Sequence, residues 1–152
     1  MSFPDYLELF ITELVAELKR RFEPSGYTVE AREPAEGELA ANSTTKQIFV
    51  TQEGFDGAEA QDADGGDFIN ITTAVMVGCV MKRPSTEVLA VGTRQRRRTL
   101  VQAVRRVMRD FTARHDVVEL AFLGEAPQLI DTFYVSLTGV ELRFSIPAEE
   151  EA

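Results

Sequence analysis

The chain has 152 residues, and 44% of them are hydrophobic, which is typical of one globular domain with a substantial core. It carries 16 Lys and Arg against 25 Asp and Glu, a net charge of −9 that argues against a general affinity for nucleic acid. The single cysteine excludes an internal disulfide, and no apolar run approaches the ~20 residues that span a bilayer. Without a secretory signal at its start, the chain is expected to be a soluble protein of the cytoplasm, or of something assembled there.

The first predicted element is a helix over residues 4–22. Its apolar residues recur at spacings of three and four and form one stripe: Leu7, Phe10, Ile11, Leu14, Val15 and Leu18. Pro4 suits the first turn, and three cations at 19–21 suit the negative end of the helix. Pro24-Ser25-Gly26 then ends it.

Short extended segments follow this helix. Residues 27–32 alternate weakly and predict a short strand, whereas residues 33–45 have turn chemistry and predict a loop. Residues 47–51 contain Ile48-Phe49-Val50, which is typical of a strand interior.

Residues 53–67 are rich in glycine and acids and predict a mobile loop facing solvent. The acids proposed to face a neighbouring protein or a central channel are Asp56, Glu59, Asp62, Asp64 and Asp67. Residues with side-chain oxygens alternate at 62–67, so a weak cation site is an alternative interpretation of this segment. The spacing lacks the third ligand, the glycine and the closing glutamate of an EF-hand, so a solvated loop without a metal is favoured.

Residues 68–82 are rich in Ile, Thr and Val and predict a long strand, with one face apolar and the other mixed. A second helix is predicted from a cap at Gly92 or Thr93 to about Ala113, with a stripe of five apolar residues: Leu100, Val104, Val107, Met108 and Phe111.

The chain closes with strand-like sequence. Residues 117–123 predict a short strand and residues 124–127 a turn. Residues 130–146 are strand-like, but the apolar parity changes at Thr138-Gly139, which predicts a bulge or tight turn there. Residues 148–152 are expected to be a disordered acidic tail after a single domain over residues 1–147. The predicted fold class is therefore α+β, with two helices packed on one face of a largely antiparallel sheet.

The main functional signal is an arginine-rich stretch on the second helix. Residues 94–114 hold eight arginines and one acid, a local charge of +7. Because the whole chain has a net charge of −9, the remaining residues together carry −16. The candidate interface residues are Arg94, Arg96, Arg97, Arg98, Arg105, Arg106 and Arg109. Arg96-Arg97-Arg98 have no acid four residues away, so their charges repel one another, and this favours an acidic protein partner. A solvated face and a nucleic-acid contact remain alternatives.

No pattern for catalysis or a cofactor is present. His115, the only histidine, is interpreted as a cation at a helix end rather than a general base. Cys79 lies in an apolar run and is expected to be a buried small hydrophobic residue. The sequence contains no nucleophile elbow, phosphate-binding glycine loop or zinc-ligand set, so no enzyme activity, cofactor or metal is expected.

The order of elements resembles the tail terminator (tail completion) proteins of tailed bacteriophages, which cap the tail tube and join it to the head. The resemblance is carried by the opening helix 6–22, the strand 69–84 leading to the helix 99–111, and the closing stretch 124–146 with Phe133-Tyr134-Val135. It covers nearly the whole chain through layout and not through a specific motif, and the arginine cluster at 94–98 is not a feature that it implies.

The resemblance implies a virion protein of the tail or neck, assembled in the host cytoplasm. It implies a homo-oligomeric ring, typically of six subunits, that contacts the tail tube, neck or stopper proteins and possibly a sheath. DNA would pass through an acidic lumen without specific binding, and no membrane, catalysis or cofactor is implied. The alternative from another class is a nucleic-acid-binding or assembly-regulating module that uses the same arginines.

Overall fold

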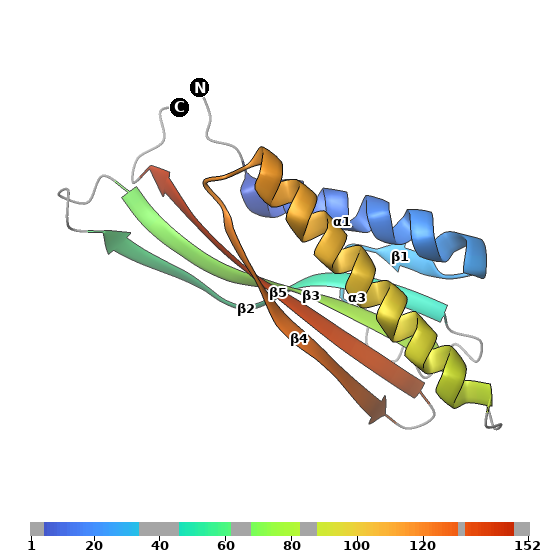
Figure 1. Cartoon of the computed structure of the whole chain (residues 1–152). Helices are drawn as coiled ribbons and strands as arrows, with labels where there is room; N and C mark the ends of the chain where they lie inside the picture. Colours follow the sequence, from blue (N-terminus) through green and yellow to red (C-terminus); the bar gives the residue numbers. More distant parts are fainter. Residues whose placement is uncertain (1–4, 34–45, 62–67, 83–87, 131–132, 148–152) are drawn as a thin grey trace.

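The computed structural model describes residues 5–33, 46–61, 68–82, 88–130 and 133–147 (Figure 1). Its elements in chain order are α1 (Tyr6–Phe22), the 3-10 helix η1 (Glu23–Ser25), β1 (Thr28–Glu30), β2 (Lys46–Gln61), β3 (Phe68–Lys82), α3 (Val88–Arg114), β4 (Glu119–Ile130) and β5 (Phe133–Pro147). Both long helices lie on the same face of one sheet (Figure 1). The predicted single α+β domain is confirmed. The expected loop at 33–45, apart from its first residue, and the tail at 148–152 lie outside the described residues.

The five strands are ordered β1-β2-β3-β5-β4. β1 runs parallel to β2, and every other neighbouring pair is antiparallel, so the sheet is mixed but mostly antiparallel. β3 occupies the centre and pairs with β5 without a register shift, from Phe68 opposite Pro147 to Lys82 opposite Phe133. A central strand has neighbours on both edges, and this accounts for the long Ile, Thr and Val-rich run that predicts β3 over the same residues.

α1 begins at a side-chain cap, and the short helix η1 that follows it ends at a glycine. The Asp5 carboxylate accepts a hydrogen bond from the Glu8 backbone N–H at 3.0 Å. After η1, Gly26 has a φ of 90°, a left-handed conformation that glycine adopts without strain. The structure confirms the predicted helix, trimmed to Tyr6–Phe22.

The main core lies between the helices and the sheet. Phe10 of α1 and Phe111 of α3 are both fully buried and meet edge to face, with ring centroids 5.3 Å apart. Val75 and Val77 of β3 lie beneath them in the same core, completely buried. This packing fixes which side of α3 faces inward.

The parity change in the last strand has a different cause from the predicted bulge. Val140 and Leu142 of β5 belong to the core under the helices, whereas Val135 packs with Phe49 and Val80 in a second cluster. Side chains alternate across a strand, so the second cluster lies on the sheet face away from the helices. β5 therefore continues straight through Thr138-Gly139 and changes the face that carries its apolar residues.

The irregularity lies in the neighbouring strand instead. The register between β4 and β5 shifts between Phe122 and Gly124, opposite Gly139. Gly124 has a φ of 119°, which a side-chain-bearing residue rarely adopts. The predicted turn at 124–127 is thus wrong, because pairing with β5 carries β4 through the bulge to Ile130.

The prediction of a loop over the acidic segment, residues 53–67, is partly wrong. Residues 53–61 continue β2 and pair with β3, with one irregularity between Glu53 and Gly57. These residues lack an apolar side-chain pattern, but their backbone groups pair with those of β3, and this pairing makes them a strand. Asp56 and Glu59 therefore lie in a strand, and Asp62, Asp64 and Asp67 lie outside the described residues. Figure 1 shows that this end of β2 and β3, with the end of β5, extends beyond both helices.

α3 is longer than the sequence predicts. It begins at Val88, so neither Gly92 nor Thr93 is its N-cap, and it continues to Arg114. The cap prediction relied on local chemistry, but the helix continues through Gly92 at the modest cost that glycine has inside a helix.

Candidate functional site

The arginines of α3 do not form one uniform face. The inward side of this helix is set by fully buried Leu100, Val104 and Phe111. Arg98, Arg105, Arg106 and Arg109 are exposed, whereas Arg96 and Arg97 are half-buried at the two borders of the inward side. The Arg94 backbone is helical, but its side chain lies outside the described residues. We call the exposed four, Arg98, Arg105, Arg106 and Arg109, the α3 arginine face.

Arg97 is held by an acid from the sheet. Its Nε and one terminal nitrogen donate to the two oxygens of Glu125 at 2.7 and 2.6 Å, and Ser136 Oγ donates to the same carboxylate at 2.8 Å. These hydrogen bonds, with that from Arg97 first, lower the pKa of Glu125 despite its partial burial. Arg97 has no acid four residues away on its own helix but finds Glu125, 28 residues along the chain, so its charge is not free for a partner.

Removal of this pair gives a measurable test. Glu125→Gln is expected to lower the free energy of unfolding by about 1–3 kcal/mol at neutral pH, because the Arg97 bonds are charge-assisted. The pKa of Glu125 is lowered on folding, so its contribution is present above its ordinary value of 4.5 and is lost as the pH falls through the folded pKa. The variant should therefore lose less stability on acidification.

Urea unfolding at pH 7 and pH 4 measures both effects. The control is Glu141→Gln, which removes an acid paired with the exposed Arg143 and should cost below about 1 kcal/mol. Equal losses for the two variants would contradict a structural role for the Arg97–Glu125 pair.

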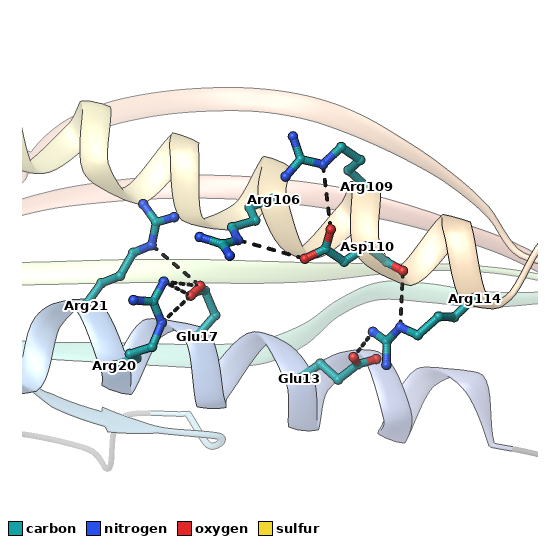
Figure 2. Close-up of polar contacts among 8 residues, drawn as sticks. All are labelled: Glu13, Glu17, Arg20, Arg21, Arg106, Arg109, Asp110 and Arg114. Carbon is teal, nitrogen blue, oxygen red and sulfur yellow. Dashed lines mark hydrogen bonds and ion pairs between the residues drawn. The ribbon is translucent and has the colours of Figure 1, made fainter.

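The α3 arginine face is held only loosely. The Arg105 guanidinium lies 4.4 Å from the Phe122 ring centroid, a cation–π contact. Arg106 and Arg109 share Asp110, with nitrogen–oxygen distances of 3.9 and 3.6 Å (Figure 2). Arg98 makes no polar contact with any residue that the structure describes. Four positive charges thus face solvent with one carboxylate between them.

The seam between α1 and α3 carries balanced charge. Arg114 at the end of α3 pairs with Glu13 of α1, and its Nε donates to the Asp110 backbone oxygen at 3.2 Å (Figure 2). Glu17 of α1 accepts from Arg20 at 2.8 Å. A cleft of about 290 Å³ lies along this seam, lined by three acids and three arginines together with Ala16 and Val107: Glu13, Glu17, Arg20, Arg106, Asp110 and Arg114. The seam is a charge-paired helix contact.

Arg96 turns the other way, toward Tyr27 and Cys79. Burial raises the pKa of the Cys79 thiol to about 12, and Arg96 opposes this only in part. Burial first, then the nearby Cys79, raises the pKa of Tyr27 to about 12, and the charge and hydrogen bond of Arg96 again act the other way. Both groups are neutral at pH 7, and the expected burial of Cys79 is confirmed.

These shifts predict alkaline sensitivity. A thiol whose pKa rises from 9.0 to about 12 on folding has its full contribution below pH 9 and loses it as the pH rises toward 12. Between pH 7.5 and pH 10, the free energy of unfolding of Cys79→Ala should therefore fall by about 1.4 kcal/mol less than that of the wild type. The control is Val77→Ala, which trims a buried neighbour on the same strand but does not titrate. Urea unfolding at both pH values gives the comparison, and equal alkaline losses in the two variants would contradict the assignment.

His115 follows α3 and packs among aromatic rings. Its backbone N–H donates to the Phe111 oxygen at 2.8 Å, and its ring centroid lies 4.5 Å from that of Phe111 and 5.6 Å from that of Tyr6. No cluster of three metal-ligating groups occurs among the described residues. Its surroundings are thus those of a packed residue just past the end of α3, and its interpretation as a cation at the helix end stays a prediction.

No protein-family model matches this chain, and no curated protein matches it significantly. Within the parts of the chain that the structure describes, no helix has the length and apolar character needed to cross a membrane.

Proposed function

We propose that this protein is a virion structural subunit, a tail terminator that forms a ring and joins the tail tube to the head–neck connector of a tailed phage. The observation that carries the proposal is the α3 arginine face, which is exposed and almost uncompensated in a chain of net charge −9. Exposed like charges on one helix repel one another, and an acidic partner relieves that repulsion.

A second copy of the chain supplies such a partner. Of the acid-rich residues 53–67, residues 53–61 form the outer part of β2, which with β3 extends beyond the helices (Figure 1). A contact between this segment and the α3 arginine face joins two different patches, so it is heterologous. Heterologous contacts repeat from subunit to subunit and generate a closed ring when the rotation allows. We propose six subunits.

The sheet edge supports the same assembly. β4 is an edge strand of 12 residues, and its outer side has no partner strand among the described residues. Open edges of this length are ready to pair with another chain, and the bulge at Leu123 and Gly124 limits how far such pairing can extend. We propose that edge pairing adds to the charged contact between subunits.

In this proposal the protein has no catalytic role and needs no cofactor. Its partners are further copies of itself, the tail tube, neck or stopper proteins and, where the tail has one, the sheath, within the virion. The acidic excess of the ring lets DNA pass without specific binding, because like charges oppose adhesion to phosphate.

Sedimentation velocity over a range of protein concentrations tests the proposal, with negative-stain images of the largest species. We expect a concentration-dependent ring whose mass corresponds to six subunits and whose formation weakens as salt rises. A strict monomer at high concentration and low salt would overturn the proposal.

A further inference from the structure

A second cleft lies at the border of α1 and α3, and its charge is not balanced. It encloses about 330 Å³ and is lined mainly by Arg21, Ser25, Tyr27, Lys46, Arg96 and Thr99. Among the described residues that line it, three are cations and none is an acid, in contrast to the charge-balanced seam cleft on the same pair of helices. The size is that of a site for a small ligand.

Two of the cations offer unused donors. Arg21 Nε and Arg96 Nε are shielded from solvent and make no hydrogen bond with any residue that the structure describes, although the Arg96 side chain also hydrogen-bonds to Tyr27. Arg21 Nε has one acid nearby, Glu17, at 3.6 Å, which is too far for a hydrogen bond. A buried donor without an acceptor is unfavourable, so an acceptor that enters the cleft relieves that cost.

The rest of the lining is suited to the same kind of ligand. The Lys46 ammonium lies 6.0 Å from the Tyr27 ring centroid, so the third cation approaches from the β2 side while Arg21 and Arg96 come from the two helices. Ser25 also lines the cleft and its hydroxyl can donate a further bond, whereas the Thr99 hydroxyl already donates to the Gln95 backbone oxygen at 3.0 Å. Guanidinium groups bind planar or tetrahedral oxyanions through paired N–H donors.

We propose that this cleft is a binding site for an oxyanion, a phosphate or carboxylate group, held by Arg21, Lys46 and Arg96. The site is separate from the α3 arginine face, and its occupancy does not depend on ring formation.

Titration of the isotopically labelled protein with inorganic phosphate, followed by amide chemical shifts, tests the proposal. We expect saturable shifts at residues around the cleft, absent when sodium chloride is added to the same ionic strength. Lys46→Gln, at an exposed position, and Arg96→Gln should each weaken binding about tenfold or more, because each removes a charge-assisted contact. Arg109→Gln is the matched control and should leave the phosphate affinity unchanged.

Acetate at equal ionic strength separates the two sources of oxyanion. Tighter binding of phosphate assigns the site to a phosphate group, and equal or tighter binding of acetate assigns it to a carboxylate. Lys46→Gln keeps the test informative if Arg96→Gln does not fold, since Lys46 is exposed. The proposal is overturned if phosphate and chloride give the same shifts, or if Lys46→Gln binds phosphate as tightly as Arg109→Gln does.

Discussion

Reversal of the charge of Arg98 and Arg109 together, by Arg98→Glu and Arg109→Glu, is expected to abolish the self-association that we propose for the wild type. Both side chains are exposed and neither contacts the core, so the fold should survive. Arg97 is unsuitable for this purpose, because its substitution would break the pair with Glu125 and mix a folding defect with an interface defect. Arg105 is also avoided, since it covers Phe122.

The matched control is Lys19→Glu with Arg143→Glu. It changes the net charge by the same amount at exposed positions on α1 and β5, away from the α3 arginine face. Sedimentation velocity should find the control assembled and the α3 variant monomeric, with the same circular dichroism. Loss of assembly in both variants would point to net charge and not to this face. Intact assembly in the α3 variant would show that these arginines form a solvated face without a protein partner.

The same pair of variants addresses the nucleic-acid alternative. Four arginines on duplex phosphates would give a slope of about −3.6 for log affinity against log salt. Tight DNA binding with that slope, lost in the α3 variant, would favour a nucleic-acid-binding module over a structural ring.

The second large effect is expected in the core. Phe111→Ala should lower the free energy of unfolding by about 3–5 kcal/mol, because it removes a fully buried ring and leaves a cavity beneath Phe10. Leu123→Ala is the control, since Leu123 is 55% exposed and should cost far less. Urea denaturation measures both. A loss below about 1 kcal/mol for Phe111→Ala would show that the two helices do not pack as described.

Elements with strong local signals were predictable from the sequence. β3 is predicted at Phe68–Lys82 because its long Ile, Thr and Val-rich run and the following proline are local features. α1 is predicted over residues 4–22 and is observed at Tyr6–Phe22, because its apolar period of three and four is local too; its N-cap at Asp5 is not predicted. Such elements need no knowledge of their neighbours.

Elements that depend on pairing were missed. The outer half of β2 has acids and glycines in place of an apolar pattern, and only its ladder with β3 identifies it as a strand. β4 continues through Gly124 and Pro127 for the same reason, since β5 provides its register. Sequence patterns describe side chains, whereas these segments are held by backbone hydrogen bonds to distant residues.

The composition of the sequence predicted where the arginine cluster lies in the chain, but it did not predict which way each arginine side chain points. The sequence located the arginine cluster, yet Arg96 faces a cleft, Arg97 binds Glu125 and only Arg98, Arg105, Arg106 and Arg109 form the exposed face. A sequence pattern can indicate an acidic partner four residues away on the same helix, but it cannot indicate a partner on a strand that packs against the helix, such as Glu125. The sequence alone could identify the exposed members only by their distance from the apolar stripe.

The central claim is that the α3 arginine face of one subunit meets the acidic segment of the next. A mixing experiment tests this claim most directly, using two variants that each fail to assemble alone. The first is Arg98→Glu with Arg109→Glu, and the second is Asp62→Lys, Asp64→Lys and Asp67→Lys together. In an equimolar mixture, each reversed patch meets its opposite and each native patch meets a native one, so an alternating ring of six can form. Sedimentation velocity should find rings only in the mixture, and a mixture that stays as monomeric as its two components would contradict the claim.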